Sequence, residues 1–259
     1  MIFLIKNNIL RRGSQYTNGK FLIRNNCTFS ATCKSDLENN LSEDTMTCQK
    51  NKKIKNYLNN IVNSIIYKTT SGEINTEIYS KDISYIDLSS RKIASIINIT
   101  GLENVRTLRL TDNKLSSIEQ LGKMTNLQHL NIDQNLLGNV DGLEKVSNLH
   151  SLTLNDNLFT SLLNIKKLSS LHELYLNNNY LESIQGVSLL KNLTHLHLYN
   201  NNIRDVSECS ILPNLEELLL TNNLITRVPK GLLLKPITIY LRNNPLVEKI
   251  TPATVFYSH

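Results

Sequence analysis

One pattern of apolar positions recurs along most of the chain. Segments of the form Leu-x-Leu-x-x-Asn, with Ile132 in place of the second leucine in one copy, start at Leu108, Leu130, Leu152, Leu174, Leu196 and Leu218, every 22 residues. Each is closed two residues after the asparagine by another apolar residue. Alternate residues of an extended segment point to opposite sides, so the pattern predicts a short strand whose leucines face inward. Six copies in strict register indicate a single repeat array.

Two degenerate copies extend the array at its ends. Ile86–Ile93 precedes the six regular copies and carries Arg91 at the asparagine position. Ile239–Leu246 follows them, with Asn244 at a step of 21 residues instead of 22. We therefore expect eight repeats over residues 83–246, with the strands stacked into one parallel sheet.

The second half of each repeat has a different period. In one copy the apolar residues fall at every third position, Leu115, Ile118, Leu121, Met124 and Leu127. A period of three favours a 3₁₀ or irregular return over an α-helix, whose period is 3.6.

The recurring asparagine predicts a structural ladder. An amide has two donors and one acceptor, enough to bond the backbone of its own turn and of the adjacent turn. Asn155, two residues before Asn157 on the exposed strand face, is expected to contribute little. The ladder residues are Asn113, Asn135, Asn157, Asn179, Asn201, Asn223 and Asn244.

These segments resemble the 22-residue class of leucine-rich repeats, which includes the leucine-rich regulatory subunit of protein phosphatase 1 and relatives in axonemes, the spliceosome and bacterial internalins. The resemblance covers residues 83–246. It implies an α/β solenoid, a right-handed β-α superhelix with a curved parallel sheet and 3₁₀ or irregular convex returns. It also implies a protein partner, such as a phosphatase catalytic subunit or a cytoskeletal or axonemal component.

The positive charge is concentrated before the array. Residues 1–82 carry 12 Lys and Arg against 7 Asp and Glu, whereas residues 83–259 carry 16 against 15. A nearly neutral array argues against nucleic-acid binding as its task. The acid-free start, up to Asp36, predicts a disordered basic leader over residues 1–50, with a cleaved mitochondrial presequence as the main alternative and a secretory signal as a further one.

The segment between leader and repeats predicts a cap. Its apolar residues fall on one helical face, which favours a helical N-terminal cap and connector over residues 51–82, with one strand around Ile74–Tyr79. Residues 247–259 are expected to form a short C-terminal cap. The apolar residues of the predicted helix are Ile54, Leu58, Ile61, Val62, Ile65 and Ile66.

No catalytic motif stands out. The sequence contains no phosphate-binding GxxxxGK[ST] loop, no GxSxG and no HExxH, and no apolar run long enough to span a membrane. Cys27, Cys33 and Cys48 do not form a CxxC zinc pattern, and Cys209 occupies an apolar repeat position. We expect no cofactor and no bound metal.

The central outward column of the strands changes character along the array. It is polar in the early repeats, at Arg109, Asn131 and Thr153, and becomes aromatic and apolar at Tyr175, His197, Leu219 and Tyr240, with Tyr199 beside it. Exposed aromatic residues on a rigid sheet are typical of a protein-binding centre, so these residues are the predicted site.

A second row joins this predicted site. Glu173, His195 and Glu217 stand at equivalent positions of three successive strands, and His197 lies two residues from His195. The favoured interpretation is a hydrogen-bonded Glu–His–Glu ladder that belongs to the protein-binding surface. A zinc site is the alternative, since imidazole and carboxylate are zinc ligands.

Together these features predict a non-enzymatic protein–protein interaction scaffold or regulatory subunit that binds a protein on its concave face. We expect a cytoplasmic monomer without membrane or nucleic-acid partners. A mitochondrial assembly or regulatory factor with a cleaved leader is the main alternative, and a zinc-dependent enzyme is a weaker one.

Overall fold

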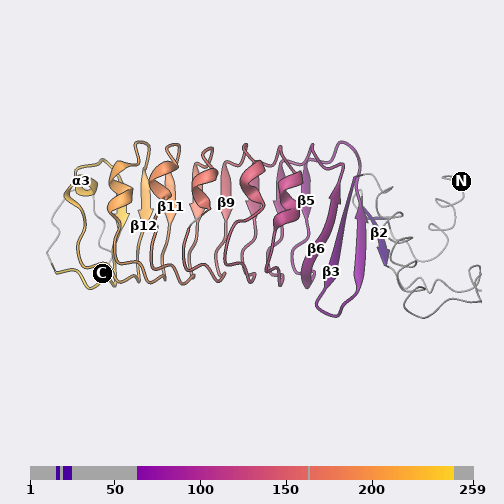
Figure 1. Cartoon of the computed structure of the whole chain (residues 1–259), viewed down its shortest axis with the longest axis horizontal. Coiled ribbons are helices and arrows are strands. Elements are labelled where there is room, and N and C mark those ends of the chain that lie inside the picture. Colours follow the sequence, from indigo (N-terminus) through magenta and orange to yellow (C-terminus); the bar gives the residue numbers. More distant parts are fainter. Residues whose placement is uncertain (1–15, 18–19, 25–62, 163, 248–259) are drawn as a thin grey trace, which may run out of the picture.

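The structure, a computed structural model, describes residues 63–162 and 164–247 and the backbone of residues 16–17 and 20–24. The described repeats form an elongated array in which successive turns lie side by side in chain order (Figure 1). A small sheet stands at the N-terminal end of the array, and the helix α3 stands near its other end.

The predicted parallel sheet is confirmed. It has eight strands in the order β13-β12-β11-β10-β9-β8-β7-β5, so strand neighbours follow the sequence and each repeat contributes one strand. Neighbours pair in parallel and in register, as Leu174 does with Leu196. The strands are β5 Tyr85–Asp87, β7 Thr107–Arg109, β8 His129–Asn131, β9 Ser151–Thr153, β10 Glu173–Tyr175, β11 His195–His197, β12 Glu217–Leu219 and β13 Thr238–Tyr240.

The returns are 3₁₀ helices in the middle of the array, as the period of three predicts. They are η1 Glu119–Lys123, η2 Leu143–Lys145, η3 Ile165–Lys167, η4 Val187–Leu189 and η5 Ser207–Ile211. The last return is instead the α-helix α3, Lys230–Leu233, with Pro229 at its N-cap. A proline at the start of a helix costs no hydrogen bond, because the first N–H groups have no partner within the helix.

The core lies between the sheet and these returns. The inward leucines of each strand are buried, and so are the apolar residues of the returns, from Ile118 to Ile225. Cys209 is one of them, and its burial raises the pKa of the thiol to about 12. A thiol that stays protonated in the core is unreactive, so Cys209 serves as a small apolar residue.

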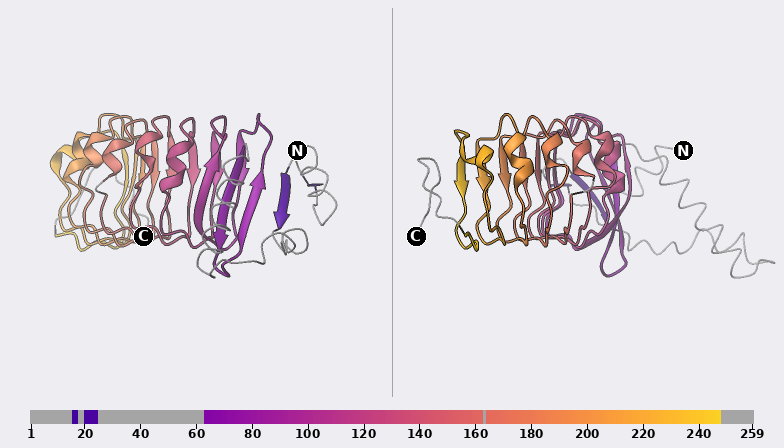
Figure 2. Two further views of the ribbon diagram at one scale, coloured as in Figure 1. Left: turned by 45° about the vertical axis from the view of Figure 1, so that its right-hand side comes forward. Right: turned by 60° about the vertical axis from the view of Figure 1, so that its left-hand side comes forward.

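The first repeat closes differently from the others. Its return is the strand β6, Ile93–Thr100, which pairs antiparallel with β3, Ser64–Thr69. β3 pairs in turn with β4, Ile74–Ile78, and β4 with β2, Lys20–Arg24, which pairs with β1, Tyr16–Thr17. The two further views in Figure 2 show this sheet standing at the end of the array. The N-terminal cap of the repeats is therefore a β-sheet.

The sequence-based helical cap is wrong for Ile65 and Ile66, which lie in β3 and are fully buried. β-branched and aromatic residues favour strands, and β4 and β6 supply hydrogen-bond partners on both sides of β3. The other four residues of the predicted helix, Ile54 to Val62, lie outside the described residues. The strand predicted around Ile74–Tyr79 is confirmed as β4.

The leader differs from its prediction where the structure describes it. Residues 16–17 and 20–24 form β1 and β2 instead of a disordered chain. β2 pairs with an edge of β4 that would otherwise leave unpaired backbone groups. The rest of residues 1–50, including Cys27, Cys33 and Cys48, and the predicted C-terminal cap beyond Val247 lie outside the described residues.

A buried carboxylate sits in the N-terminal sheet. Glu77 is fully buried and accepts hydrogen bonds from the hydroxyls of Tyr67, at 3.3 Å, and Tyr79, at 2.6 Å. Burial, reinforced by the charge of Glu77, raises the pKa of the Tyr79 hydroxyl above its usual range. The two tyrosine hydroxyls replace hydrogen bonds to water that the Glu77 side chain loses on burial, because buried polar groups need hydrogen-bond partners.

Across the described part of the chain, no helix has the length and apolar character that a membrane crossing needs.

Candidate functional site

The repeated asparagine forms a ladder inside the array. The Nδ2 atom of Asn157 donates to the carbonyls of Ile132, at 3.0 Å, and Leu154, at 3.2 Å, while its Oδ1 accepts the N–H of Leu137 at 3.0 Å. The same bonds recur from Asn113 to Asn244, so each amide joins its own turn to the preceding one. The ladder therefore fixes the spacing and register of the strands of the eight-stranded sheet.

A second polar ladder lies on the sheet side, two residues before the first. The Oδ1 atom of Asp133 accepts the N–H of Asn155 at 2.7 Å, and the Oδ1 of Asn155 accepts the N–H of Asn177 at 2.9 Å. Asn177 then accepts the N–H of Tyr199 at 3.0 Å. The expectation that Asn155 contributes little is therefore wrong, because its amide satisfies a backbone donor of the next repeat.

A third row of polar residues takes a left-handed backbone at the bend. Asn178 and Asn200 have φ of 55°, and the amide of Asn200 donates to Asn178 at 2.7 Å. Asparagine tolerates positive φ better than most residues, since its short polar side chain bonds locally. The abundance of asparagine thus reflects three structural ladders. Residues of this row with positive φ are Asp112, Gln134, Asp156, Asn178, Asn200, Asn222 and Asn243.

The aromatic column lies on the outward face of the eight-stranded sheet, which we call the sheet face. Tyr175 on β10, His197 on β11 and Leu219 on β12 are register neighbours, and Tyr240 on β13 continues the row. The rings of Tyr175 and His197 meet edge to face with centroids 4.7 Å apart. These side chains are half-buried, and that of His197 is only 18% exposed, because each packs sideways on its neighbours. The expectation from the sequence that these positions are exposed is corrected to half-buried.

The glutamates and histidines form one charged row next to the column. Glu173, His195 and Glu217 are register neighbours on β10, β11 and β12. A carboxylate oxygen of Glu217 lies 3.8 Å from Nε2 of His195, and the other lies 3.6 Å from Nε2 of His197. Glu173 accepts a hydrogen bond from the hydroxyl of Ser151 at 2.8 Å. Glu217 is therefore the carboxylate that faces both imidazoles.

Burial controls protonation of His197 and Tyr175 in the aromatic column. It lowers the pKa of His197, against the opposing influence of Glu217, and raises the pKa of the Tyr175 hydroxyl, together with the charge of Glu173. Both shifts favour the neutral side chain near pH 7. The described residues contain no cluster of three or more His, Cys, Asp or Glu side chains placed to hold a metal ion.

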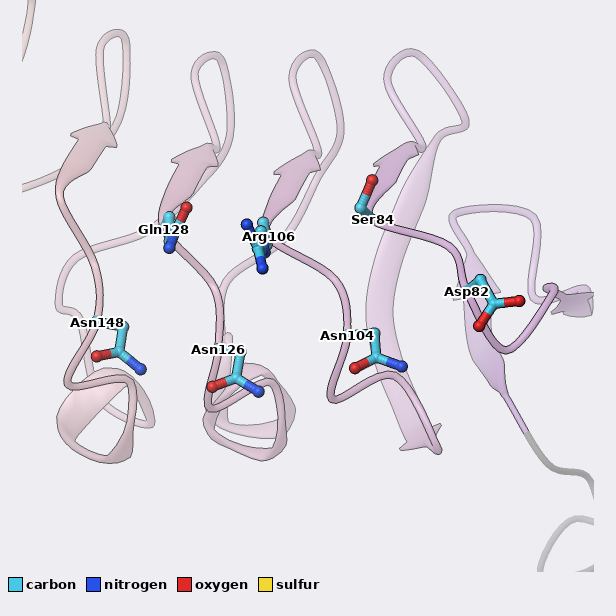
Figure 3. Close-up of a pocket in the computed structure, with 7 residues that line it drawn as sticks. All are labelled: Asp82, Ser84, Asn104, Arg106, Asn126, Gln128 and Asn148. Carbon is cyan, nitrogen blue, oxygen red and sulfur yellow. The ribbon is translucent and has the colours of Figure 1, made fainter.

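A polar groove of about 590 Å³ runs along the N-terminal ends of the early strands. Asn104, Asn126 and Asn148 form one row of its wall, and a second row stands nearer the strands (Figure 3). The three amides donate to carbonyls of the preceding turn, as Asn126 does to Glu103 at 2.9 Å. The second row and the end of the groove consist of Ser84, Arg106, Gln128 and Asp82.

A line of exposed apolar side chains follows the other ends of the strands. Leu136, Leu158 and Tyr180 occupy the same position of three successive repeats and are 42%, 45% and 56% exposed. We call this line the apolar ridge. It is a second surface on which a partner can bury apolar area.

Comparisons with known proteins agree with this architecture. Residues 103–145 and 191–232 match the family described as "Leucine Rich repeats (2 copies)". The chain is a leucine-rich-repeat protein. No curated protein has a significantly similar sequence.

Solved structures of similar fold include other leucine-rich-repeat proteins. An internalin (inlF) of Listeria monocytogenes has a TM-score of 0.58 and 24% identity over 65% of this chain and 50% of its own. Internalin C2 of the same species has a TM-score of 0.57 and 24% identity over 64% of this chain and 78% of its own. A leucine-rich-repeat protein of Leptospira interrogans has a TM-score of 0.52 and 26% identity over 67% of this chain and 52% of its own. This chain thus spans about half the length of two of these proteins.

Leucine-rich-repeat proteins are typically non-enzymatic scaffolds for protein interactions, and their stacked repeats present extended binding surfaces. In this array the sheet brings together Tyr175, His197 and Leu219 as predicted, with His195 and Glu217 beside them.

The polar groove and the apolar ridge were not predicted from the sequence. The pattern that indicates the groove is the recurring pair Asn126-Leu127. The ridge is indicated by the doublets Leu136-Leu137 and Leu158-Phe159, in which only one of the two apolar residues can face the core.

Proposed function

We propose that this leucine-rich-repeat protein is a non-enzymatic scaffold that binds a protein partner on the C-terminal half of its sheet face. The observation that carries the proposal is the row of Tyr175, His197, Leu219 and Tyr240 on four adjacent strands. At about 4.8 Å per strand the row is roughly 14 Å long, a suitable size for the centre of an interface. Its half-buried rings are held in place before binding, which reduces the entropy lost on association.

The surrounding residues support the same surface. Tyr199 flanks the row, and its backbone is held by Asn177 of the preceding repeat. Glu173, His195 and Glu217 provide a polar border on one side. Aromatic residues surrounded by polar groups are typical of interface centres.

The zinc-enzyme alternative receives less support. His195 and His197 have ring centroids 6.5 Å apart, and Glu217 is the carboxylate that faces both. A catalytic zinc needs three protein ligands converging at about 2 Å. We propose that the row acts in recognition and that the protein works in the cytoplasm, as a monomer, without a cofactor.

The proposed site predicts unequal effects along one column. Tyr175→Ala and Tyr240→Ala are each expected to weaken partner binding by about 1–2 kcal/mol or more, because they remove aromatic anchors. Thr153→Ala, at the equivalent position on β9, should change binding by less than about 0.5 kcal/mol. The partner is first isolated by affinity capture on the intact chain, and each variant is then titrated calorimetrically. A purified phosphatase catalytic subunit is the first candidate to test directly, followed by cytoskeletal and axonemal components.

The folded state of each variant must be checked, since Tyr175 packs on His197 and its loss will also cost some stability. Circular dichroism at the titration temperature serves this purpose. The variant Leu158→Ser changes the apolar ridge and tests whether the partner binds there instead of on the sheet face. If both Tyr variants bind like the wild type and Leu158→Ser does not, the partner uses the ridge and our assignment fails.

The mitochondrial alternative is tested by a separate prediction about subcellular localisation. Residues 1–40 fused to a fluorescent protein are expected to give uniform cytosolic fluorescence with no clipping of the fusion. The reason is structural, because β2, Lys20–Arg24, pairs with β4, and cleavage after it would remove a strand of the cap. Mitochondrial fluorescence together with a shortened product on a gel would favour the mitochondrial factor instead.

A further inference from the structure

Two glutamates on the sheet face form no ion pair with a lysine or arginine of the described residues. Glu173 and Glu217 stand on either side of His195, and Glu217 contacts His195 at 3.8 Å and His197 at 3.6 Å. Among the ion pairs of the described residues, none joins either glutamate to a lysine or arginine. In these pairs Glu217 meets only imidazoles, which are neutral unless protonated, and Glu173 takes part in none of them.

Aromatic rings lie beside these carboxylates. Tyr175 follows Glu173 by two residues on β10, and its ring is fixed edge to face against His197. A carboxylate accepts hydrogen bonds from a guanidinium or ammonium group, and the face of an aromatic ring attracts the same cation. Carboxylates with capacity for further hydrogen bonds next to a tyrosine ring are the chemistry that recognises an arginine or lysine side chain.

We propose that the Glu173–His195–Glu217 row receives an arginine or lysine side chain of the protein partner, and that His195 and His197 weaken this binding as the pH falls. The inference rests on the proposed function above and names the chemistry of its partner. Charge complementarity selects the occupant, since the two glutamates are the fixed charges of the row.

The direction of the pH effect follows from the groups that face the two imidazoles. These are Glu173 and Tyr175 on β10, the Thr194 hydroxyl at 2.9 Å from Nδ1 of His195, and Glu217 on β12. Between about pH 8 and 5 an imidazole gains a proton and a positive charge. That charge pairs with Glu217 and repels an incoming cation. Burial lowers the pKa of His197, so this ring gains its proton only toward the acidic end of the range.

The test uses the full chain and a defined probe, the peptide acetyl-Arg-Phe-Arg-amide. The matched peptide with citrulline in place of arginine has the same shape without the charge. At pH 7.5 the arginine peptide is expected to bind at least fivefold more tightly, measured from the NMR shifts of the tyrosine and histidine rings. Glu173→Gln and Glu217→Gln should each reduce this binding at least fivefold, whereas exposed Glu182→Gln should leave it unchanged. Equal binding of the two peptides would overturn the proposal.

The histidine part is tested by repeating the titration at pH 5.5. The wild type should bind the arginine peptide at least threefold more weakly than at pH 7.5, and the double variant His195→Asn, His197→Asn should retain less than half of that response. His129→Asn is the control, because His129 is exposed and lies on β8, two strands from Glu173 on β10. An undiminished pH response in the double variant contradicts the role of the histidines.

The outcome also separates this inference from the proposed function. If Tyr175→Ala abolishes binding of the captured partner while the two Gln variants bind it normally, the inference fails and the proposed function stands. If the Tyr variants bind the partner normally, the proposed function itself fails.

Discussion

Gly142→Ala is expected to destabilise the array by about 3 kcal/mol or more. Gly142 has a φ of +100°, and an added Cβ would lie 2.3 Å from the Cα of Glu119 in the preceding return. A strained backbone costs about 1–3 kcal/mol and a backbone clash about as much again. The Cα of Glu119 cannot move alone, because the turns are stacked on both sides. Urea unfolding followed by circular dichroism measures the loss.

Two other glycines allow the stability cost of backbone strain to be measured separately from the cost of the steric clash. Gly186 has a similar φ of +96°, but its added Cβ would be 3.8 Å from the nearest atoms, so Gly186→Ala should cost only about 1–2 kcal/mol. Gly138 has no positive φ, and its nearest contact is also 3.8 Å, so Gly138→Ala should change stability by less than about 0.5 kcal/mol. If Gly142→Ala were as mild as Gly138→Ala, the close approach of the second and third returns would be wrong.

Asn157→Ala is expected to cost about 1–3 kcal/mol in the free energy of unfolding. The change leaves the N–H of Leu137 without its acceptor. The carbonyls of Ile132 and Leu154 each lose one of two amide donors and keep the other, from Asn135 and Asn179. The orphaned buried N–H accounts for most of the expected loss. The same urea titration measures this change, and the loss should appear without a change in the binding of the arginine peptide.

Neighbouring asparagines provide graded controls for this change. Asn155→Ala removes one acceptor, that of the Asn177 N–H, and should cost about 1 kcal/mol. Asn202→Ala, at an exposed position next to the ladder, should cost less than about 0.5 kcal/mol. Equal losses for all three would show that the inward ladder does not carry the register of the repeats.

The sequence by itself determined the array. The step of 22 residues from Leu108 to Leu218 and the period of three in the returns were sufficient to predict eight parallel strands and 3₁₀ returns. Each repeat contacts only its neighbours, so local pattern and global fold coincide. For the same reason Tyr175 and His197, exactly one repeat of 22 residues apart, could be placed side by side before the structure was known.

Only the tertiary structure decided what happens where the repeat stops. Ile65 and Ile66 fit a helical period, but the pairing of β3 with β4 and β6 makes them part of a sheet. The pairing of β3 with β6 joins residues that are 24 to 36 positions apart in the chain, from Thr69↔Ile93 to Ser64↔Thr100, and a local period does not contain such contacts. The bond from Asn155 to Asn177, the half-burial of His197 and the approach of Gly142 to Glu119 are likewise contacts between turns. Periodicity specifies which turns are neighbours, whereas packing between their side chains sets how closely those neighbours meet.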